Sequence, residues 1–244
     1  MSISANSLVV LSANCQGLRD FKKRVDVINY FKETGAHIIC LQDTHLTDND
    51  KTNFYNIWSG TFYLHGQNTN SRGVAVLFSN TFDFQVKDVN TDRAGNFLQL
   101  VIETYNTKIN LVNIYAPNLD NPNFYRSVEN LVAQSNSDLN IICGDYNLIM
   151  DPTKDCQNYK HLNNPKAREI VLEIIETYKL VDVFRFLHPD EKKYTWRRKN
   201  PLKQARLDFF LISDAATDLV EDCSILPSYR SDHSSSVEVT FFKI

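Results

Sequence analysis

The sequence is poor in glycine and cysteine and has no long hydrophobic run. Its 244 residues include seven glycines and five cysteines. None of its apolar runs approaches the roughly 20 residues of a membrane-spanning helix. Residues 1–6 also lack the basic segment and the apolar stretch of a signal peptide. We therefore expect no transmembrane segment, no secretory leader and no membrane partner.

The cysteines are odd in number and widely spaced, which argues against a disulfide framework. Cys15, Cys40 and Cys143 lie in or beside apolar runs, as buried free thiols do. This pattern predicts a protein of a reducing compartment.

The sequence also lacks the motifs of several common enzyme classes. It has no glycine-rich phosphate loop, no C-x-x-C or H-E-x-x-H pair and no histidine cluster. A zinc site is therefore not expected. No G-x-S-x-G turn is present, and the consecutive residues Ser231-Asp232-His233 cannot form a serine-hydrolase triad.

The composition is that of an ordinary globular protein, with 43% hydrophobic and 23% charged residues. These values exclude collagen, coiled coil and intrinsic disorder. The net charge of −3 argues against a globally basic nucleic-acid binder, but it leaves room for a local basic patch.

Short apolar segments alternate with a few amphipathic ones, without a low-complexity linker, so we expect a single domain over residues 1–244. Many short strands with about three substantial helices indicate an α/β sandwich of sheets covered by helices rather than a doubly wound sheet. Strands are predicted at 8–14, 37–43, 62–65, 73–78, 97–104, 108–115, 139–143, 193–196, 205–212, 224–226 and 236–242, and helices at 20–34, 122–135 and 165–178.

Polar side chains recur where the apolar segments end. Burying so many polar groups is costly unless they bind one another or a ligand. Taken one at a time, residues such as Asn14 or Asn118 are more simply explained as turn formers; taken jointly, they predict a site. The residues are Asn14, Asp43, Tyr115 with Asn118, Asp145 with Asn147, and Asp232 with His233.

Asp208 is a separate case because it lies within an apolar segment, between Leu207 and Phe209. A carboxylate there needs a partner or stays uncharged, and His233 is the obvious partner. Carboxylate and amide oxygens suit magnesium or manganese. Such an ion beside an Asp–His pair is a reasonable apparatus for phosphodiester hydrolysis.

These residues, in this order, resemble the exonuclease–endonuclease–phosphatase superfamily, and most of all the apurinic-like endonuclease domain of LINE-type (non-LTR) retrotransposons. The resemblance covers essentially the whole chain, and the combination of G-D-x-N with a terminal S-D-H is its most specific part. The matching segments are Asn14, Leu41-Gln42-Asp43-Thr44, Ile114-Tyr115-Ala116-Pro117-Asn118, Gly144-Asp145-Tyr146-Asn147, Arg206-Leu207-Asp208-Phe209 and Ser231-Asp232-His233-Ser234.

The resemblance implies a four-layer α/β sandwich, with two mixed β-sheets flanked by helices. It implies a magnesium-dependent endonuclease, in which manganese can substitute, that nicks double-stranded DNA and leaves a 3′-hydroxyl to prime reverse transcription. The chain contains no polymerase segment, so we expect a domain of a longer polyprotein. The element RNA and the reverse transcriptase would then be partners only through the missing parts. Synthesis in the cytoplasm and action on chromosomal DNA in the nucleus follow from the same resemblance.

The resemblance also implies roles for the site residues. Asp43 binds the metal, with Asn14 orienting nearby groups and Asp232 as a further ligand. Asp145 orients and deprotonates the attacking water, Asn147 holds a phosphate oxygen, and Tyr115 does likewise or assists the leaving group. His233, aligned by Asp208, stabilises the transition state.

Two positions distinguish this chain within the superfamily. The family usually has Glu where this chain has Asp43, whose side chain is one methylene shorter. Gln16 stands where many apurinic-site repair relatives carry an acid, which favours the retrotransposon branch.

A basic segment supplies the candidate DNA contact. Five cationic residues, Arg197, Arg198, Lys199, Lys203 and Arg206, fall within ten positions near the turn at Asn200-Pro201. In the retrotransposon enzymes that the chain resembles, the corresponding hairpin enters the minor groove. An isolated charge run is otherwise a solvated hairpin, and Trp196 is either a stacking residue or part of the core. The predicted DNA-binding residues are Asn118, Thr195, Trp196, Arg197, Arg198, Lys199 and Lys203.

Two other interpretations stay open. The first is another enzyme of the superfamily: an apurinic-site repair endonuclease, a DNase-like nuclease, or an inositol phosphate or sphingomyelin phosphatase. The second is a catalytically weak fold used as a DNA-binding module, for which Asp43 is the one hint. The basic hairpin and the Tyr115-Ala116-Pro117-Asn118 turn favour a polynucleotide substrate.

Overall fold

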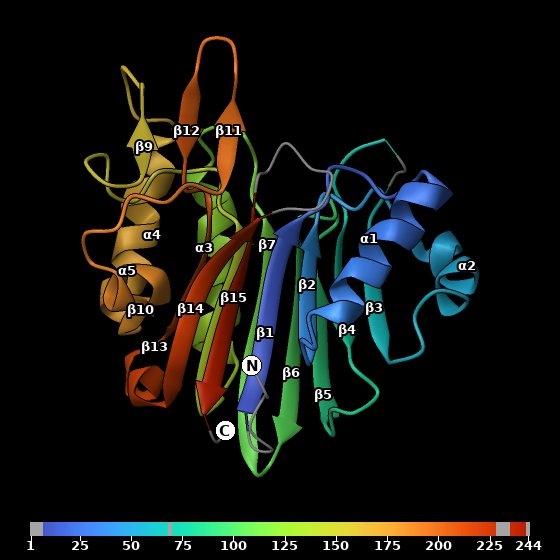
Figure 1. Cartoon of the computed structure of the whole chain (residues 1–244). Helices are drawn as coiled ribbons and strands as arrows, with labels where there is room; N and C mark the ends of the chain where they lie inside the picture. Colours follow the sequence, from blue (N-terminus) through green and yellow to red (C-terminus); the bar gives the residue numbers. More distant parts are fainter. Residues whose placement is uncertain (1–6, 68–69, 228–234, 243–244) are drawn as a thin grey trace.

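The computed structural model describes residues 7–67, 70–227 and 235–242, and within them the chain forms a sandwich of two mixed sheets, each six-stranded (Figure 1). The first sheet has the order β14-β15-β1-β2-β4-β3 and the second the order β10-β13-β8-β7-β6-β5. In each sheet one central pair is parallel, β1 with β2 and β7 with β8, and the other pairs are antiparallel. The strands of the first sheet are β1 (Ser7–Asn14), β2 (Ile38–Gln42), β3 (Phe62–His65), β4 (Val74–Phe78), β14 (Val220–Pro227) and β15 (Ser235–Phe242), and those of the second are β5 (Gln85–Thr91), β6 (Phe97–Thr104), β7 (Thr107–Tyr115), β8 (Leu139–Asp145), β10 (Leu180–Asp182) and β13 (Asp208–Ser213).

Helices cover the outer faces of both sheets, which completes the four predicted layers. Helices α1 (Phe21–Glu33) and α2 (Lys51–Tyr55) lie on one side of the sandwich, and α3 (Pro122–Gln134) and α4 (Pro165–Thr177) lie on the other (Figure 1). The described part of the chain also contains a short helix α5 (Val183–Leu187) and 3₁₀ helices at Asp48–Asp50 and Asp214–Leu219. The predicted fold class is confirmed.

Local sequence explains where the helices begin. The Asp20 side chain accepts a hydrogen bond from the Lys23 N–H and caps α1. Asn121 caps α3 in the same way, and Pro122 occupies the first turn, where its missing N–H costs nothing.

Successive side chains of a strand point to opposite faces of its sheet, and the core therefore has three layers. Leu8 and Val10 of β1 face the second sheet, whereas Val9 and Leu11 face α1. Because both faces of β1 are covered, its sequence is a continuous apolar run. A third cluster fills the space between the second sheet and helices α3 and α4.

A buried polar bridge joins the two sheets at their centre. Asn113 of β7 is fully buried. Its Nδ2 donates to the carbonyl oxygens of Leu41 and Ala75 in the first sheet, at 3.0 Å and 2.9 Å. Its Oδ1 accepts from Nε2 of Gln42 at 2.7 Å. These bonds fix the two sheets relative to each other directly beneath Asp43.

The structure corrects the predicted strands in the last quarter of the chain. The strand expected at 205–212 is broken at Arg206 and Leu207 into β12 (Lys203–Ala205) and β13. The strand expected at 193–196 begins later, as β11 (Trp196–Arg198). Together with β9 (Cys156–Gln157), these strands form a small sheet, β11-β12-β9, that projects beyond the upper end of the sandwich (Figure 1).

Two further features concern the helices and the cysteines. No helix in the described ranges has the length and apolarity needed to cross a bilayer. All five cysteines are free thiols, and Cys15, Cys40 and Cys143 are buried as predicted.

Candidate active site

The predicted site residues of the two central strand pairs meet at one edge of the sandwich. Asn14 ends β1 and Asp43 directly follows β2, while Tyr115 and Asp145 end β7 and β8. Tyr115 and Asp145 are paired in register, as are Asn14 and Gln42. Since parallel neighbours end at the same edge, each sheet presents its polar residues side by side.

A hydrogen bond between the sheets closes the site. Asn14 Nδ2 donates to Asp145 Oδ2 at 2.9 Å, and both side chains are buried. The other Asp145 oxygen, Oδ1, accepts from the Asn147 N–H at 2.9 Å. The Asn14 Oδ1 atom accepts from the Gln16 N–H at 3.1 Å. The Asp145 carboxylate is therefore held in one orientation from both sheets.

Asp43 lies on the more exposed side of the site, in a loop with two left-handed residues. Asp43 and His45 have φ angles of 50° and 57°. The Asp43 Oδ1 atom lies 3.0 Å from His45 Nε2 and accepts from the Arg72 N–H at 3.1 Å. Asp43 also lies near enough to the Tyr115 side chain for its charge to act on the phenol.

The Tyr115 phenol is kept protonated. Burial raises its pKa well above the ordinary value of 10.0, and the negative charges of Asp43 and Asp145 raise it further. Tyr115 therefore acts as a hydrogen-bond donor at neutral pH, and not as a phenolate.

Glycine is required at the start of the G-D-x-N segment. Gly144 has a φ of +134°, and a Cβ built there would lie 2.0 Å from the carbonyl oxygen of Ile114. No other residue fits so close to β7. Two residues after Asp145, Asn147 adopts a φ of 49°, and its Nδ2 donates to the Ala116 carbonyl at 2.7 Å. The amide carries a second N–H, which suits a phosphate oxygen.

Asp208 lies next to Asp145 because the two residues are paired across β13 and β8. It is buried, in agreement with the sequence prediction. The backbone N–H groups of Leu207 and Asp208 donate to the Thr195 hydroxyl, at 3.0 Å and 3.1 Å. Thr195 is fully buried. The structure therefore contradicts its predicted contact with DNA and gives it a positioning role beneath Asp208.

Two predicted residues lie outside the described part of the chain. Asp232 and His233 belong to the segment 228–234, so their geometry relative to Asp208 and Asp43 stays a prediction.

The hairpin β11–β12 carries an exposed group of cations. Arg197, Arg198 and Lys199 are exposed, and Lys203 is half-buried. Asn118, beside the site on the loop after β7, is exposed as well. Trp196 is half-buried and packs on a small core cluster that contains Ala205 and Leu207, which favours the core interpretation.

Arg206 does not belong to the exposed group. It is 1% exposed, and its guanidinium binds Asp155 through Nε and Nη2 at 2.8 Å and 2.9 Å. The same group binds Asp182 at 2.6 Å. Of the five cationic residues counted in the basic segment, four therefore lie on the hairpin, and the fifth, Arg206, is buried.

His45 and Asn113 are functional-site residues that sequence reasoning missed. His45 is only two residues from Asp43, but its orientation depends on the left-handed turn. Asn113 lies within an apolar strand, and an amide inside such a strand was the available signal.

The donor set fits a hard divalent cation. Asp43 and Asp145 supply carboxylate oxygens and Asn14 an amide oxygen at one edge, and such ligands favour magnesium or manganese over zinc. In the described ranges, no group of three His, Cys, Asp or Glu side chains is preassembled to bind a metal. The site therefore requires the waters that magnesium usually keeps, or ligands from elsewhere in the chain.

Comparison with known proteins decides the family. The profile of the endonuclease/exonuclease/phosphatase family matches residues 11–233. The chain belongs to this family. It is accordingly a nuclease-type enzyme of the superfamily, a metal-dependent phosphodiester hydrolase, and the resemblance predicted from its motifs is confirmed.

Two family relatives come from different biological settings. The Transposon TX1 uncharacterized 149 kDa protein of Xenopus laevis is 27% identical over 237 residues, which are 93% of this chain and 18% of that protein. The exodeoxyribonuclease of Bacillus subtilis (strain 168) is 27% identical over 253 residues, covering 92% of this chain and 96% of the enzyme. The chain thus spans less than a fifth of the transposon protein but nearly all of the bacterial enzyme.

Solved structures of the family share the fold. The AP endonuclease LMAP from Leishmania major superposes with a TM-score of 0.82 at 18% identity, over 100% of this chain and 90% of that one. The 3′ phosphatase NExo from Neisseria, bound to a product DNA hairpin, gives 0.77 at 18% identity, over 96% and 99% of the two chains.

Proposed function

We propose that the chain is the endonuclease domain of a LINE-type retrotransposon, which nicks one strand of double-stranded DNA and leaves a 3′-hydroxyl primer for reverse transcription. The observation that carries the proposal is the oriented Asp145 carboxylate beside Asp43 at the meeting edge of the sheets. The match to a transposon protein over 93% of the chain supports the biological setting. The longer polyprotein, its RNA and its reverse transcriptase, and action in the nucleus, are parts of this proposal.

Asp145 is the proposed base for the attacking water. Its two oxygens already accept hydrogen bonds from Asn14 and the Asn147 backbone, which fix the direction of the remaining lone pairs. Asn147 and Tyr115 donate to the phosphate, and this preorganised polarity stabilises the charge that develops in the transition state. Asp43 and Asn14, with Asp232, would hold a magnesium ion, which polarises a phosphoryl oxygen when bound.

His233 is proposed to donate to the phosphate while Asp208 holds its ring. The buried position of Asp208 beside Asp145 supports this pairing, because a carboxylate there needs a cationic partner. Asn118 and the exposed hairpin residues Arg197, Arg198 and Lys199, with Lys203, are the proposed contacts with the DNA backbone.

A supercoiled-plasmid nicking assay tests the proposal, with magnesium or with EDTA, alongside an oligonucleotide that contains an abasic site. We expect magnesium-dependent conversion of supercoiled to open-circular plasmid, without strong preference for the abasic site. Extension of the nicked plasmid by a DNA polymerase without phosphatase treatment checks the 3′-hydroxyl. Binding without any cleavage would contradict the proposal and favour a DNA-binding module.

Apurinic-site repair is the second candidate. The coverage of 96% of the bacterial exodeoxyribonuclease and the fold shared with AP endonucleases support it. Cleavage confined to the abasic oligonucleotide would establish this candidate in place of the first.

A further inference from the structure

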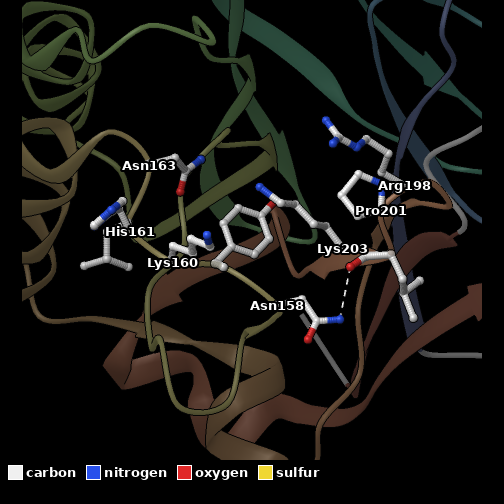
Figure 2. Close-up of a pocket in the computed structure, with 10 residues that line it drawn as sticks. Asn158, Lys160, His161, Asn163, Arg198, Pro201 and Lys203 are labelled. Carbon is white, nitrogen blue, oxygen red and sulfur yellow. Dashed lines mark hydrogen bonds between the residues drawn. The ribbon is translucent and has the colours of Figure 1, made fainter.

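The two sides of the candidate active site are held by different segments. On the side of the hairpin β11–β12, the loop 158–163 is tied to the hairpin, because Asn158 Nδ2 donates to the Leu202 carbonyl at 3.0 Å (Figure 2). On the side of Asp43, the contacting segment is the turn between β5 and β6, residues 92–96. The proposed mechanism assigns no role to this turn.

Two carbonyl groups of the turn bind backbone N–H groups at the site. The Asn96 carbonyl accepts from the Tyr115 N–H at 2.6 Å, and the Gly95 carbonyl accepts from the Gly73 N–H at 3.0 Å. Asn96 is buried, and Gly95 is packed so closely that a Cβ there would lie 3.1 Å from the Gly66 Cα. The turn therefore contacts a proposed phosphate-binding residue and the loop before β4 at the same time.

The loop before β4 in turn positions Asp43. The Arg72 N–H donates to Asp43 Oδ1 at 3.1 Å, and the Thr44 N–H donates to the Gly73 carbonyl at 3.0 Å. Gly73 has a φ of +94°, and a Cβ there would lie 2.7 Å from Thr44 Oγ1. Because this contact leaves no room for movement, a displacement of the turn is transmitted to the Asp43 carboxylate.

The turn itself is closed by the Asp92 carboxylate. Asp92 Oδ1 accepts from the N–H groups of Asn96 and Phe97, at 2.8 Å and 3.3 Å. His65, at the end of the edge strand β3, lies against the same residue. Its Nε2 atom is 2.6 Å from the Asp92 carbonyl oxygen and 3.5 Å from Asp92 Oδ1. One imidazole nitrogen therefore contacts both the backbone and the carboxylate of the residue that closes the turn.

The surroundings of His65 favour its protonated form. The hydrogen bond to Asp92 raises the pKa of His65 and outweighs burial, which lowers it, and the charges of Asp92 and Asp48 raise it further. The residue paired with His65 on β4 is Val74, which carries no charge. Burial alone would raise the pKa of Asp92, but hydrogen bonds from His65 and from the turn hold it below the usual value. The ion pair is thus present below the raised pKa of His65 and is lost as the pH rises through it.

We propose that His65 and Asp92 form a positioning pair for the active site. The protonated imidazole holds the turn, and the turn keeps Tyr115 and the Asp43 loop in the geometry that binds a divalent cation. Both residues act through the turn and not by contact with metal or DNA. Deprotonation of His65 weakens the pair, because a charge-assisted hydrogen bond is replaced by a neutral one, and so lowers the affinity for the cation. The inference rests on the proposed function in taking Asp43 as a metal ligand.

Nuclear magnetic resonance of the histidine side chains tests this coupling in the intact chain. The pKa of His65 is measured with and without saturating magnesium, and the spectrum of His65→Gln assigns the resonance. Coupling between two sites is reciprocal, so we expect magnesium to raise this pKa by about 0.7, which corresponds to a fivefold coupling. Direct repulsion by the cation would lower the pKa instead. A lowered or unchanged pKa would overturn the proposal.

Variants of the pair test the coupling through manganese affinity, measured by electron paramagnetic resonance without DNA. His65→Gln keeps a hydrogen-bond donor and Asp92→Asn keeps an oxygen that can close the turn, but each removes one charge of the pair. We expect about fivefold weaker binding in each. The double variant should lose no more than either single one, because the two residues act as a unit.

His188→Gln is the matched control. This histidine follows α5, and its Nε2 lies 3.1 Å from the Cys223 carbonyl oxygen. The control should bind manganese as the parent does. Parental affinity in both His65→Gln and Asp92→Asn would overturn the proposal, as would an equal loss in His188→Gln.

Plasmid nicking by the same preparations separates this inference from the proposed function. A parent that binds manganese but does not nick plasmid counts against the proposed function, while the pair is still judged by its effect on metal affinity. A parent that nicks plasmid, with parental manganese affinity in both variants of the pair, counts against the pair alone.

Discussion

Asp145 is the residue on which the proposed chemistry depends most directly. Asp145→Asn keeps the shape of the side chain and an oxygen for one of its two hydrogen bonds, but it removes the base. We expect plasmid nicking to fall by about 10²–10³-fold or more, with little change in DNA affinity. The measurement is a nicking time course, with anisotropy for DNA affinity.

The matched control for Asp145→Asn is Asp190→Asn, in which an exposed carboxylate undergoes the same change. It should nick at the parental rate. Parental activity in Asp145→Asn would show that another group activates the water.

At the residue scale, the sequence predicted which residues lie at the edge of the sandwich, but it did not predict which distant residues bury or bind the others. Asn14, Asp43 and Asp145 could be predicted because each ends a buried strand, and strand ends of parallel pairs meet. Thr195 was assigned to DNA, and Arg206 was counted with the cations of the basic segment, because both lie in that part of the sequence. Their burial depends on Asp155 and other residues distant along the chain, which no local pattern reveals.

At the scale of elements, the β11–β12 hairpin is the proposed link to DNA. Arg197 and Arg198 are exposed on β11, and the hairpin projects from the sandwich (Figure 1). The double variant Arg197→Ala/Arg198→Ala should flatten the log–log salt dependence of duplex binding by about 0.9 for each phosphate that the hairpin no longer neutralises. Binding titrations at several salt concentrations measure the slope.

The control for the hairpin is a double variant on α1, Lys22→Ala/Lys32→Ala. Both lysines are exposed, and α1 covers the opposite side of the sandwich (Figure 1). The control removes the same charge and should leave the slope as it is. If both double variants change the slope equally, net charge and not the hairpin governs binding.

The elements that sequence patterns missed share a physical cause. β5 is an edge strand whose residues are mostly exposed, so it lacks the apolar alternation by which strands are found. The break between β12 and β13 is invisible in the sequence because Ala205 and Leu207 are both buried. The chain bends there because Arg206 turns inward to Asp155.

At the scale of the whole molecule, the Arg206 anchor joins the small sheet to the sandwich. Asp155 precedes β9, Asp182 ends β10, and Arg206 separates β12 from β13. Arg185 also binds Asp155, at 2.6 Å. Burial alone would raise the pKa of Asp155, but hydrogen bonds and charge from Arg206 outweigh it and hold the pKa below the usual value.

Asp155→Asn should therefore lower the free energy of unfolding at pH 7 by about 3 kcal/mol, because it leaves Arg206 underpaired in the interior. The depressed pKa means that the carboxylate stabilises the fold above its unfolded pKa of about 3.9 and loses this effect as the pH falls below it. The difference in the free energy of unfolding between the variant and the parent should accordingly become smaller in acid. Denaturant unfolding at several pH values measures it.

Asp218→Asn, at an exposed position, serves as the control for Asp155→Asn and should match the parent throughout. A stability gap for Asp155→Asn that stays constant from pH 7 to pH 3 would show that the anchor acts through packing and not through charge.

The pairing of β1 with β15 has a consequence for synthesis of the protein. These two strands lie at opposite ends of the chain and are neighbours in the first sheet. Asn14, Asp43 and Asp145 are translated well before β15. The first sheet, which positions Asn14 and Asp43, therefore stays incomplete on the ribosome until β15 has been translated. The proposed nuclease activity therefore arises only after β15 has emerged, so that translation interrupted before β15 should yield fragments without this activity.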